Sequence, residues 1–282
     1  MIDVIKDADV IVITAGAGMS VDSTDVNGNN LPDFRGDVGM WKAYPALGNK
    51  NLKFAEIANP KAFDKNPELA WAFYGHRFDL YKNATPHAGY KAILELAKQK
   101  EDYFVVTSNV DGQFQKAGFD KNKIYEVHGR INQFQCTACN NVWAAPKHTV
   151  FNINPKTLNL RGPIPKCKCG ATARPNIMMF NDTTFNSAST IQQAKDFNTF
   201  MAKYDKGHNI VIVEFGAGKA IPTIRKIGNN IHSKVKNATL VRINPRESQG
   251  PTGTISIDKT AVDAVAEDLV SEDIKKLFFI KG

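Results

Sequence analysis

The chain has 282 residues and a net charge of +8, with 43% hydrophobic and 23% charged residues. This length suffices for one large domain, or for a large domain with a smaller one inserted, and the composition is that of an ordinary globular protein. No stretch approaches the roughly 18 apolar residues that a bilayer crossing needs, so we expect no membrane partner. Lysines are spread along the whole chain, which favours a solvated basic surface and does not indicate a nucleic-acid partner.

The N-terminus and the cysteines bear on the cellular compartment. The first ten residues, MIDVIKDADV, place acidic side chains where a secretory signal needs basic ones, and no cleavage-site pattern follows. We therefore expect a cytoplasmic protein. The four cysteines lie in two close pairs, which without a secretory signal indicate a metal site more than a disulfide framework.

Short apolar runs bounded by loop residues predict buried parallel strands. They occupy residues 10–14, 103–107, 209–213 and 239–243. Helical patterns lie between them, notably at residues 68–81 and 89–98. This alternation predicts an α/β fold with a Rossmann-like, doubly wound parallel sheet.

Two stretches interrupt the alternation. Residues near 40–85 are rich in aromatics and helix formers, and residues near 131–175 hold all four cysteines among prolines and glycines. We predict that both are insertions that together form a smaller domain with a helical module and a cysteine module. The predicted limits are 1–40, 86–130 and 174–282 for the large domain, and 41–85 and 131–173 for the small one.

The first predicted strand leads directly into a glycine-rich turn at Gly16, Ala17, Gly18 and Ser20. Such a turn between a strand and a helix lets the backbone approach a pyrophosphate, whose charge is held by free N–H groups at the helix start. On this segment alone, the alternative is a plain tight turn.

The next motif adds a family resemblance. After the polar residues 24–30, the sequence Leu-Pro-Asp-Phe-Arg-Gly occupies residues 31–36. The two segments resemble the first sirtuin signature, in which a GAG(I/M)S turn leads to a (I/L)PDFRG loop. The resemblance implies that Asp33, Phe34 and Arg35 belong to an NAD site, with Phe34 shielding the reacting ribose carbon and Arg35 contacting phosphate. Residues 24–30 replace a single glycine of the family pattern, and we expect them to bulge into solvent.

A second motif follows the strand predicted at 103–107. The run Ser108, Asn109, Asp111 and His128-Gly129 resembles the sirtuin (T)QNID…AG…(E)xHG signature, with serine where the family commonly has glutamine. The resemblance implies that His128 is the base that takes a ribose hydroxyl proton after the acyl-lysine oxygen has displaced nicotinamide. A histidine suits this step because its unperturbed pKa of about 6.5 lies near working pH.

The same resemblance assigns the neighbouring residues. Asn109 would hold the ribose and a water, Asp111 would engage the nicotinamide carboxamide, and Ser108 would lie in the cofactor site. Further along, the family's Gly-Thr-Ser turn is replaced by Gly216, Ala217 and Gly218, and its Ile-Asn pair at the adenosine ribose is matched by Asn244. Gly216 and Asn244 are therefore further NAD candidates, while Ala217 and Gly218 can offer only backbone groups.

The cysteine spacing predicts a closed metal site. Cys136 and Cys139 are separated by two residues, and Cys167 and Cys169 by one. Two sulfur pairs held on turns can surround one zinc ion tetrahedrally, and such a site is structural. Sirtuins carry a comparable zinc ribbon just after the catalytic histidine, usually with two CxxC pairs. Free thiols are the alternative.

Residues 174–182 resemble the sirtuin RPxVVxFGE segment at the substrate channel. The resemblance implies that Ile177, Met178 and Phe180 line an apolar tunnel for the acyl-lysine stem, beside a peptide bound in β-strand fashion. A buried core strand fits this composition equally well. Asn181 and Asp182 replace the family's Gly-Glu, which leaves acyl preference open.

The resemblance covers roughly residues 9–245 in the family's order. It implies an NAD-dependent protein-lysine deacetylase or deacylase, which transfers the acyl group of an acylated-lysine protein to ADP-ribose and releases nicotinamide. An ADP-ribosyltransferase or NAD hydrolase is the alternative, and a non-catalytic NAD sensor is a third. Without the resemblance, the residues alone indicate a nucleotide-binding α/β protein with a zinc ribbon.

Overall fold

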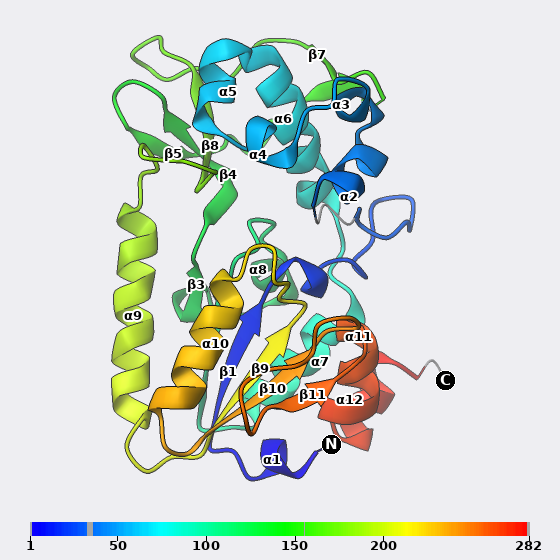
Figure 1. Cartoon of the computed structure of the whole chain (residues 1–282), viewed down its shortest axis with the longest axis vertical. Helices are drawn as coiled ribbons and strands as arrows, with labels where there is room; N and C mark the ends of the chain where they lie inside the picture. The colour runs from blue at the N-terminus through cyan, green and yellow to red at the C-terminus, as the bar shows by residue number, and fades with distance from the viewer. Residues whose placement is uncertain (1, 33–35, 155, 281–282) are drawn as a thin grey trace.

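The larger lobe of the protein is built on a parallel β-sheet (Figure 1). The computed structural model describes residues 2–32, 36–154 and 156–280. The strands of this sheet are β1 (Val10–Ala15), β2 (Asp102–Thr107), β3 (Ile124–Glu126), β9 (Ile210–Phe215), β10 (Ala238–Ile243) and β11 (Ile255–Ile257). Across the described residues their order is β11-β10-β9-β1-β2-β3, and every neighbouring pair is parallel.

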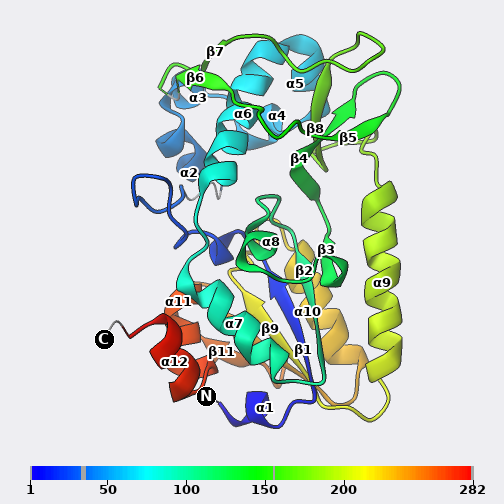
Figure 2. The same cartoon turned by 180° about the vertical axis from the view of Figure 1, so that it is seen from behind.

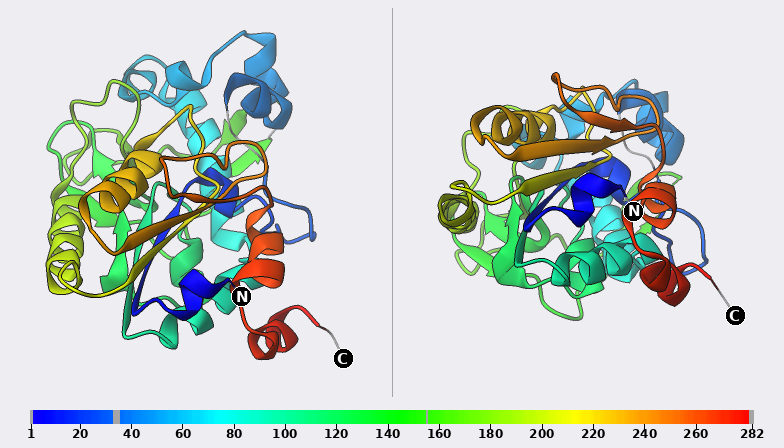
Figure 3. Two further views of the ribbon diagram at one scale, coloured as in Figure 1. Left: turned by 60° about the horizontal axis from the view of Figure 1, so that its bottom comes forward. Right: turned by 90° about the horizontal axis from the view of Figure 1, so that it is seen from below.

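Helices cover both faces of this sheet, as the view in Figure 3 shows. They are α1 (Asp3–Lys6), α7 (Ala88–Lys98), α8 (Gln113–Ala117), α9 (Ala188–Tyr204), α10 (Thr223–Lys234), α11 (Ala261–Ala264) and α12 (Glu272–Phe278), with the short 3₁₀ helix η2 (Lys121–Lys123) and the π-helix η3 (Val265–Leu269). Helices α7, α11 and α12 pack on one face and α9 and α10 on the other. Because both faces are covered, all side chains of β1 are buried, and all of them are apolar except that of Thr14. In the described ranges, no helix has the length and apolarity needed to cross a membrane.

The smaller lobe lies beyond the carboxyl ends of the strands (Figure 2). Its helices are α2 (Gly36–Ala43), α3 (Pro45–Asn49), α4 (Phe54–Ile57), α5 (Pro60–Lys65) and α6 (Pro67–Asn83). Its strands are β4 (Gly129–Cys136), β5 (Val142–Ala144), β6 (Asn152–Asn154), β7 (Asn159–Arg161) and β8 (Ala173–Ile177). Strands β5, β4 and β8 form one antiparallel sheet, and β6 pairs with β7.

Trp71 of α6 joins the helical and cysteine-containing parts of the smaller lobe. Its side chain is fully buried, and its ring stacks on Phe151 and meets the edge of Phe134 at centroid distances of 5.1 and 5.2 Å. The indole N–H donates to the Ala173 carbonyl oxygen at 2.7 Å, so its polar atom is satisfied within the core. One side chain therefore holds a helix, β4, β8 and the segment before β6 together.

The doubly wound α/β fold predicted from the alternating pattern is confirmed, and the limits of each predicted strand lie within two residues of those observed. The short edge strands β3 and β11 were not predicted. Strands β4 and β8 pair with each other. Each strand crosses one of the predicted domain limits, β4 the limit at 130/131 and β8 the limit at 173/174. Those domain limits stay a prediction. Within the 24–30 insertion, residues 26–30 are exposed, as expected.

We predict that Trp71→Ala lowers the free energy of unfolding by about 3–5 kcal/mol, because it leaves a large cavity and an unsatisfied carbonyl group. Urea unfolding followed by tryptophan fluorescence and circular dichroism measures this change. Trp143→Ala is the matched control, because Trp143 is only half-buried beside Phe134. Equal losses for the two variants would contradict the role given to Trp71.

Candidate active site

A cavity of about 1010 Å³ lies between the two lobes, at the carboxyl edge of the parallel sheet. Residues that follow four different strands contribute to its wall: Gly16, Ser108, Gly216 and Asn244. The strand order reverses between β1 and β9, and ligands of open α/β sheets bind at such reversals. The cavity is therefore where this fold places a ligand.

Two glycine turns approach each other at this edge. A Cβ atom added to Gly216 would lie 2.3 Å from the Gly18 Cα, and one added to Gly16 would lie 2.8 Å from the Ala217 Cα. Gly216 also has a φ of +57°, which favours glycine. Gly16, Ala17 and Ser20 line the cavity, whereas Gly18 is buried in the contact between the turns. After the first turn the chain forms the short 3₁₀ helix η1 (Ala17–Met19).

Ser20 is the centre of a polar network in the wall of the cavity. Its hydroxyl donates to Asp111 Oδ2 at 2.6 Å and accepts from Asn109 Nδ2 at 3.0 Å. Because its single proton is used on Asp111, the Tyr90 hydroxyl, 3.1 Å away, must be the donor to Ser20. The Asn109 amide nitrogen also donates to the Gly16 carbonyl oxygen at 3.0 Å. The network thereby joins the ends of β1 and β2 to helix α7.

Burial raises the pKa of two groups in this network, Asp111 and Tyr90. It raises the pKa of Asp111, although the hydrogen bonds from Ser20 and from the Gln113 N–H act against it. It also raises the pKa of Tyr90 well above the usual value, so this phenol stays protonated and keeps its donor role. Tyr90 was not predicted from the sequence, because nothing local distinguishes it from other tyrosines in an amphipathic helix.

His128 enters the cavity from the turn between β3 and β4. Burial lowers its pKa below the ordinary value, and a hydrogen bond to the Ser108 backbone opposes that shift. The next residue, Gly129, has a φ of +73°, and a Cβ there would lie 2.2 Å from the Asn176 carbonyl oxygen. Glycine at 129 therefore lets β8 pack closely beside the histidine.

The opposite wall of the cavity is apolar. Ile177, Met178 and Phe180 all line it, as does Met179, which was not predicted. The Phe180 N–H donates to the Ala58 carbonyl oxygen at 2.9 Å, and the Phe54 and Phe180 rings meet at 5.6 Å. The segment after β8 is thereby fixed to the helical part of the smaller lobe.

Helix α6 adds cavity residues that the sequence analysis missed. Tyr74, Arg77 and Tyr81 line the cavity, and the Arg77 Nη2 donates to the Tyr81 hydroxyl at 3.0 Å. Their spacing of three and then four residues places them on one helix face, which is the signal that could have identified them. The predicted NAD-site residues Asp33, Phe34 and Arg35 lie outside the described residues.

The four cysteine sulfur atoms lie within 4.8 Å of one another. Cys136 and Cys169 are 3.6 Å apart, as are Cys139 and Cys167, and all four thiols are free. Four thiolates at about 2.3 Å from a tetrahedral zinc ion would be about 3.8 Å apart, so this arrangement fits zinc. Burial opposes ionisation of Cys136, but the N–H groups of Cys139 and Ala138 outweigh it and lower the pKa of that thiol to about 6.

Comparison with protein families and sequences identifies relatives. A family model described as "Sir2 family" matches residues 16–203. An "NAD-dependent protein deacylase 1" from Archaeoglobus fulgidus is 32% identical over 186 residues, which cover 64% of this chain and 64% of the relative. An "NAD-dependent protein deacylase" from Leptospira interrogans is 29% identical over 254 residues, or 86% of this chain and 87% of the relative.

Solved structures share the fold. A Sir2 homologue in complex with NAD has a TM-score of 0.67 and 25% identity, covering 98% of this chain and 93% of that one. A mutant Sir2 homologue in complex with ADP ribose has a TM-score of 0.64 and 26% identity, covering 99% and 97%.

We predict that the purified protein contains one zinc ion per chain and that Cys139→Ser reduces this content. Loss of a structural metal should lower the unfolding midpoint by roughly 5 °C or more, since metal binding contributes directly to folding. Elemental analysis and differential scanning calorimetry, before and after a strong chelator, make the measurement. A metal-free wild-type protein with an unchanged midpoint would argue for free thiols.

Proposed function

This chain belongs to the Sir2 family, and we propose that it is an NAD-dependent protein-lysine deacylase. In the proposed reaction the acyl group passes to ADP-ribose, and nicotinamide and the free lysine are released. The observation that carries the proposal is that one cavity joins two kinds of wall. Backbone turns after four parallel strands suit a dinucleotide, and the apolar segment after β8 suits an acyl-lysine stem.

His128 is the proposed general base. It lies in the cavity with a lowered pKa, so its imidazole is neutral and can accept a proton at neutral pH. NAD, when bound, supplies the ribose carbon that receives the acyl oxygen. The role of His128 is to take a ribose hydroxyl proton.

Asn109 and Asp111 are proposed to orient the nicotinamide riboside half. Both amide protons of Asn109 are used by the Gly16 carbonyl and Ser20, so its carbonyl oxygen is the group that remains for the ribose or a water. Asp111 is held by Ser20 and by the Gln113 N–H, which fixes its carboxyl group for the carboxamide. Gly16, Ala17, Gly18, Ser20, Asp33, Phe34, Arg35, Ser108, Gly216 and Asn244 complete the proposed NAD site.

The acyl-lysine is proposed to enter along Ile177, Met178 and Phe180. Met178 is 43% exposed although it lines the cavity, which suits a wall that a peptide covers when it binds. Asn181, with a φ of +53°, takes the turn position of the family's glycine. Asp182 forms a buried ion pair with Arg174 at 2.8 Å, so its carboxylate stabilises the turn and does not face the peptide.

Zinc is proposed to be structural, held by the four cysteines away from the cavity. A closed four-thiolate site leaves no position for a substrate, so we assign it no role in the reaction. Thiolate ligands persist in a reducing compartment, which is consistent with the proposed cytoplasmic location.

We predict that the wild-type protein deacetylates an acetyl-lysine peptide in the presence of NAD, and that His128→Ala slows this about 10²–10⁴-fold, the usual contribution of a general base. Mass spectrometry of the peptide and chromatography of nicotinamide follow the two products. His148→Ala is the control, because His148 is exposed on the smaller lobe.

The same assay separates the proposed function from its alternatives. Nicotinamide released at the same rate without peptide would favour NAD hydrolysis. Transfer of label from NAD onto protein would favour ADP-ribosylation, and tight NAD binding with no turnover would favour a sensor.

The pH dependence of kcat/KM tests the protonation state of His128. A base must be deprotonated, so activity should fall as pH drops through the pKa of His128. Because burial lowers that pKa, the acidic limb should be centred below about 6.5, the value for an unperturbed histidine. An acidic limb centred above about 7 would contradict this assignment.

A further inference from the structure

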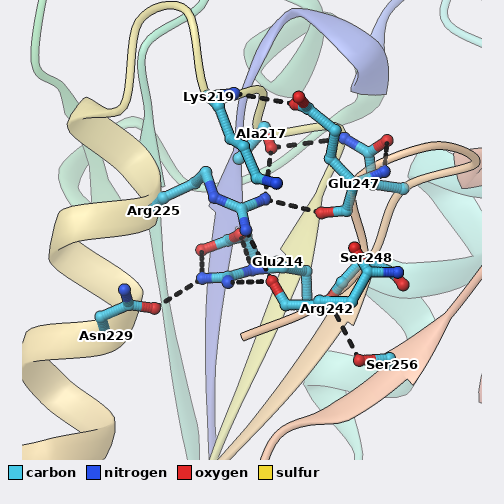
Figure 4. A network of polar contacts seen from close by, with 11 residues as sticks. Glu214, Ala217, Lys219, Arg225, Asn229, Arg242, Glu247, Ser248 and Ser256 are labelled. Carbon is cyan, nitrogen blue, oxygen red and sulfur yellow. Dashed lines mark hydrogen bonds and ion pairs between the residues drawn. The ribbon is translucent and has the colours of Figure 1, made fainter. Parts of the chain in front are cut away.

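A network of charged side chains lies beneath the end of the cavity formed by Gly216, Ala217 and Asn244 (Figure 4). Glu214 of β9 and Arg242 of β10 are direct partners in the parallel register, and both side chains are buried. Arg242 Nε donates to Glu214 Oε1 at 2.5 Å, and Nη2 donates to Oε2 at 3.3 Å. Burial raises the pKa of Glu214, while the adjacent Arg242 favours its charged form.

The surroundings of this ion pair are shaped to hold it. A Cβ atom on Gly228 of α10 would lie 2.6 Å from Glu214 Oε2, so only glycine leaves room for the carboxylate beside the helix. The remaining donors of Arg242 reach the Asn229 side chain at 2.7 Å and the Gln249 carbonyl oxygen at 3.0 Å. The pair is therefore extensively hydrogen-bonded, as a buried charge requires.

A second guanidinium, that of Arg225 from α10, connects this network to the cavity wall. Its nitrogens donate to three backbone carbonyl oxygens: Ala217 at 3.1 Å, Glu247 at 2.7 Å and Gln249 at 2.6 Å. Figure 4 shows these contacts converging from the turn after β9 and the loop after β10. Arg225 is 8% exposed, so it acts as a fixed link between the two segments.

The Ala217 carbonyl oxygen is held by two donors. It accepts from Arg225 and, at 3.3 Å, from the Asn244 side-chain amide. In a trans peptide the carbonyl oxygen of residue 217 and the N–H of residue 218 point in opposite directions. The Gly218 N–H consequently points away from Arg225. Gly218 lines the cavity, and no acceptor in the described part of the protein meets its N–H.

We propose that Arg225 is a positioning residue of the NAD site, which orients the Ala217–Gly218 peptide so that its N–H donates to the bound dinucleotide. This inference rests on the proposed function of the cavity. Ala217 and Gly218 have no side-chain donors, so the peptide N–H is the donor that this turn can offer.

The peptide group before Gly218 needs a contact such as the one from Arg225, because Gly218 would otherwise leave it free to rotate. Glycine allows the peptide plane that precedes it to rotate more freely than any other residue does. A clamp on the carbonyl side keeps the donor in its binding orientation before the ligand arrives, which lowers the entropic cost of binding. The Glu214–Arg242 pair supports the clamp, because Arg242 and Arg225 both donate to the Gln249 carbonyl oxygen.

The test compares Arg225→Met and Arg225→Lys with the wild-type protein. Methionine keeps much of the apolar stem and removes all three hydrogen bonds, whereas lysine restores a cation that can reach carbonyl oxygens. We expect Arg225→Met to weaken ADP-ribose binding in calorimetry and to raise the KM for NAD by about tenfold or more, the effect of losing a hydrogen bond to a charged group. The kcat and the KM for the acetyl-lysine peptide should stay within about twofold, and Arg225→Lys should recover part of the affinity.

His232→Gln is the matched control. His232 lies on the same helix and also meets a carbonyl oxygen of the following loop, that of Thr252 at 3.0 Å, but it does not line the cavity. This variant should bind ADP-ribose as the wild type does, even where its unfolding midpoint falls.

A spectroscopic measurement on the wild-type protein tests the inference even if the Arg225→Met variant does not fold. In protein labelled with ¹⁵N-glycine, the Gly218 amide proton should move downfield when ADP-ribose is added. An unmoved Gly218 signal, or an Arg225→Met variant that binds ADP-ribose as tightly as the wild type, would overturn this inference but not the proposed function. Failure of the wild-type protein to bind ADP-ribose would overturn the proposed function and this inference with it.

Discussion

The backbone contact between the turn at Gly16–Gly18 and the turn at Gly216 determines the geometry of the site. These turns end β1 and β9, the two strands between which the sheet order reverses. Side chains at these positions would force the strand ends apart, because a Cβ atom on any of the three glycines would lie far inside van der Waals distance of the opposite backbone. The close approach leaves backbone groups as the lining of the cavity, which is what a phosphate-containing ligand needs.

Polar groups are buried on both sides of this contact, and in both places they are hydrogen-bonded to several partners. Ser20 uses its one proton and both lone pairs on Asp111, Asn109 and Tyr90. Arg242 is bonded to Glu214, Asn229 and the Gln249 carbonyl. A buried polar network that is satisfied is rigid, and one that loses a member leaves a costly unpaired group. The site is thus held by specific hydrogen bonds where an ordinary α/β core would be apolar.

The smaller lobe supplies the other wall, and its construction explains how distant segments meet there. The Met178 N–H donates to the His128 carbonyl oxygen, so the apolar segment and the candidate base share one hydrogen bond. Trp71 and the antiparallel β4–β8 pair hold that segment against α6. Movement of β4, which carries Cys136, would therefore be transmitted to the apolar wall of the cavity.

Sequence by itself determined the features that depend on neighbouring residues. Continuous runs of valine and isoleucine specified the central strands, glycines marked the turns where no side chain fits, and the spacing of the cysteine pairs predicted that the four thiols cluster. Tertiary structure alone decided which distant groups meet. Tyr90 reaches Ser20 across 70 positions, and the limits of β4 and β8 depend on a pairing between strands that lie far apart along the chain. Arg225 has no local signal, because an arginine on an amphipathic helix is ordinarily solvated, and only the packing of α10 against two loops brings three carbonyl groups to it.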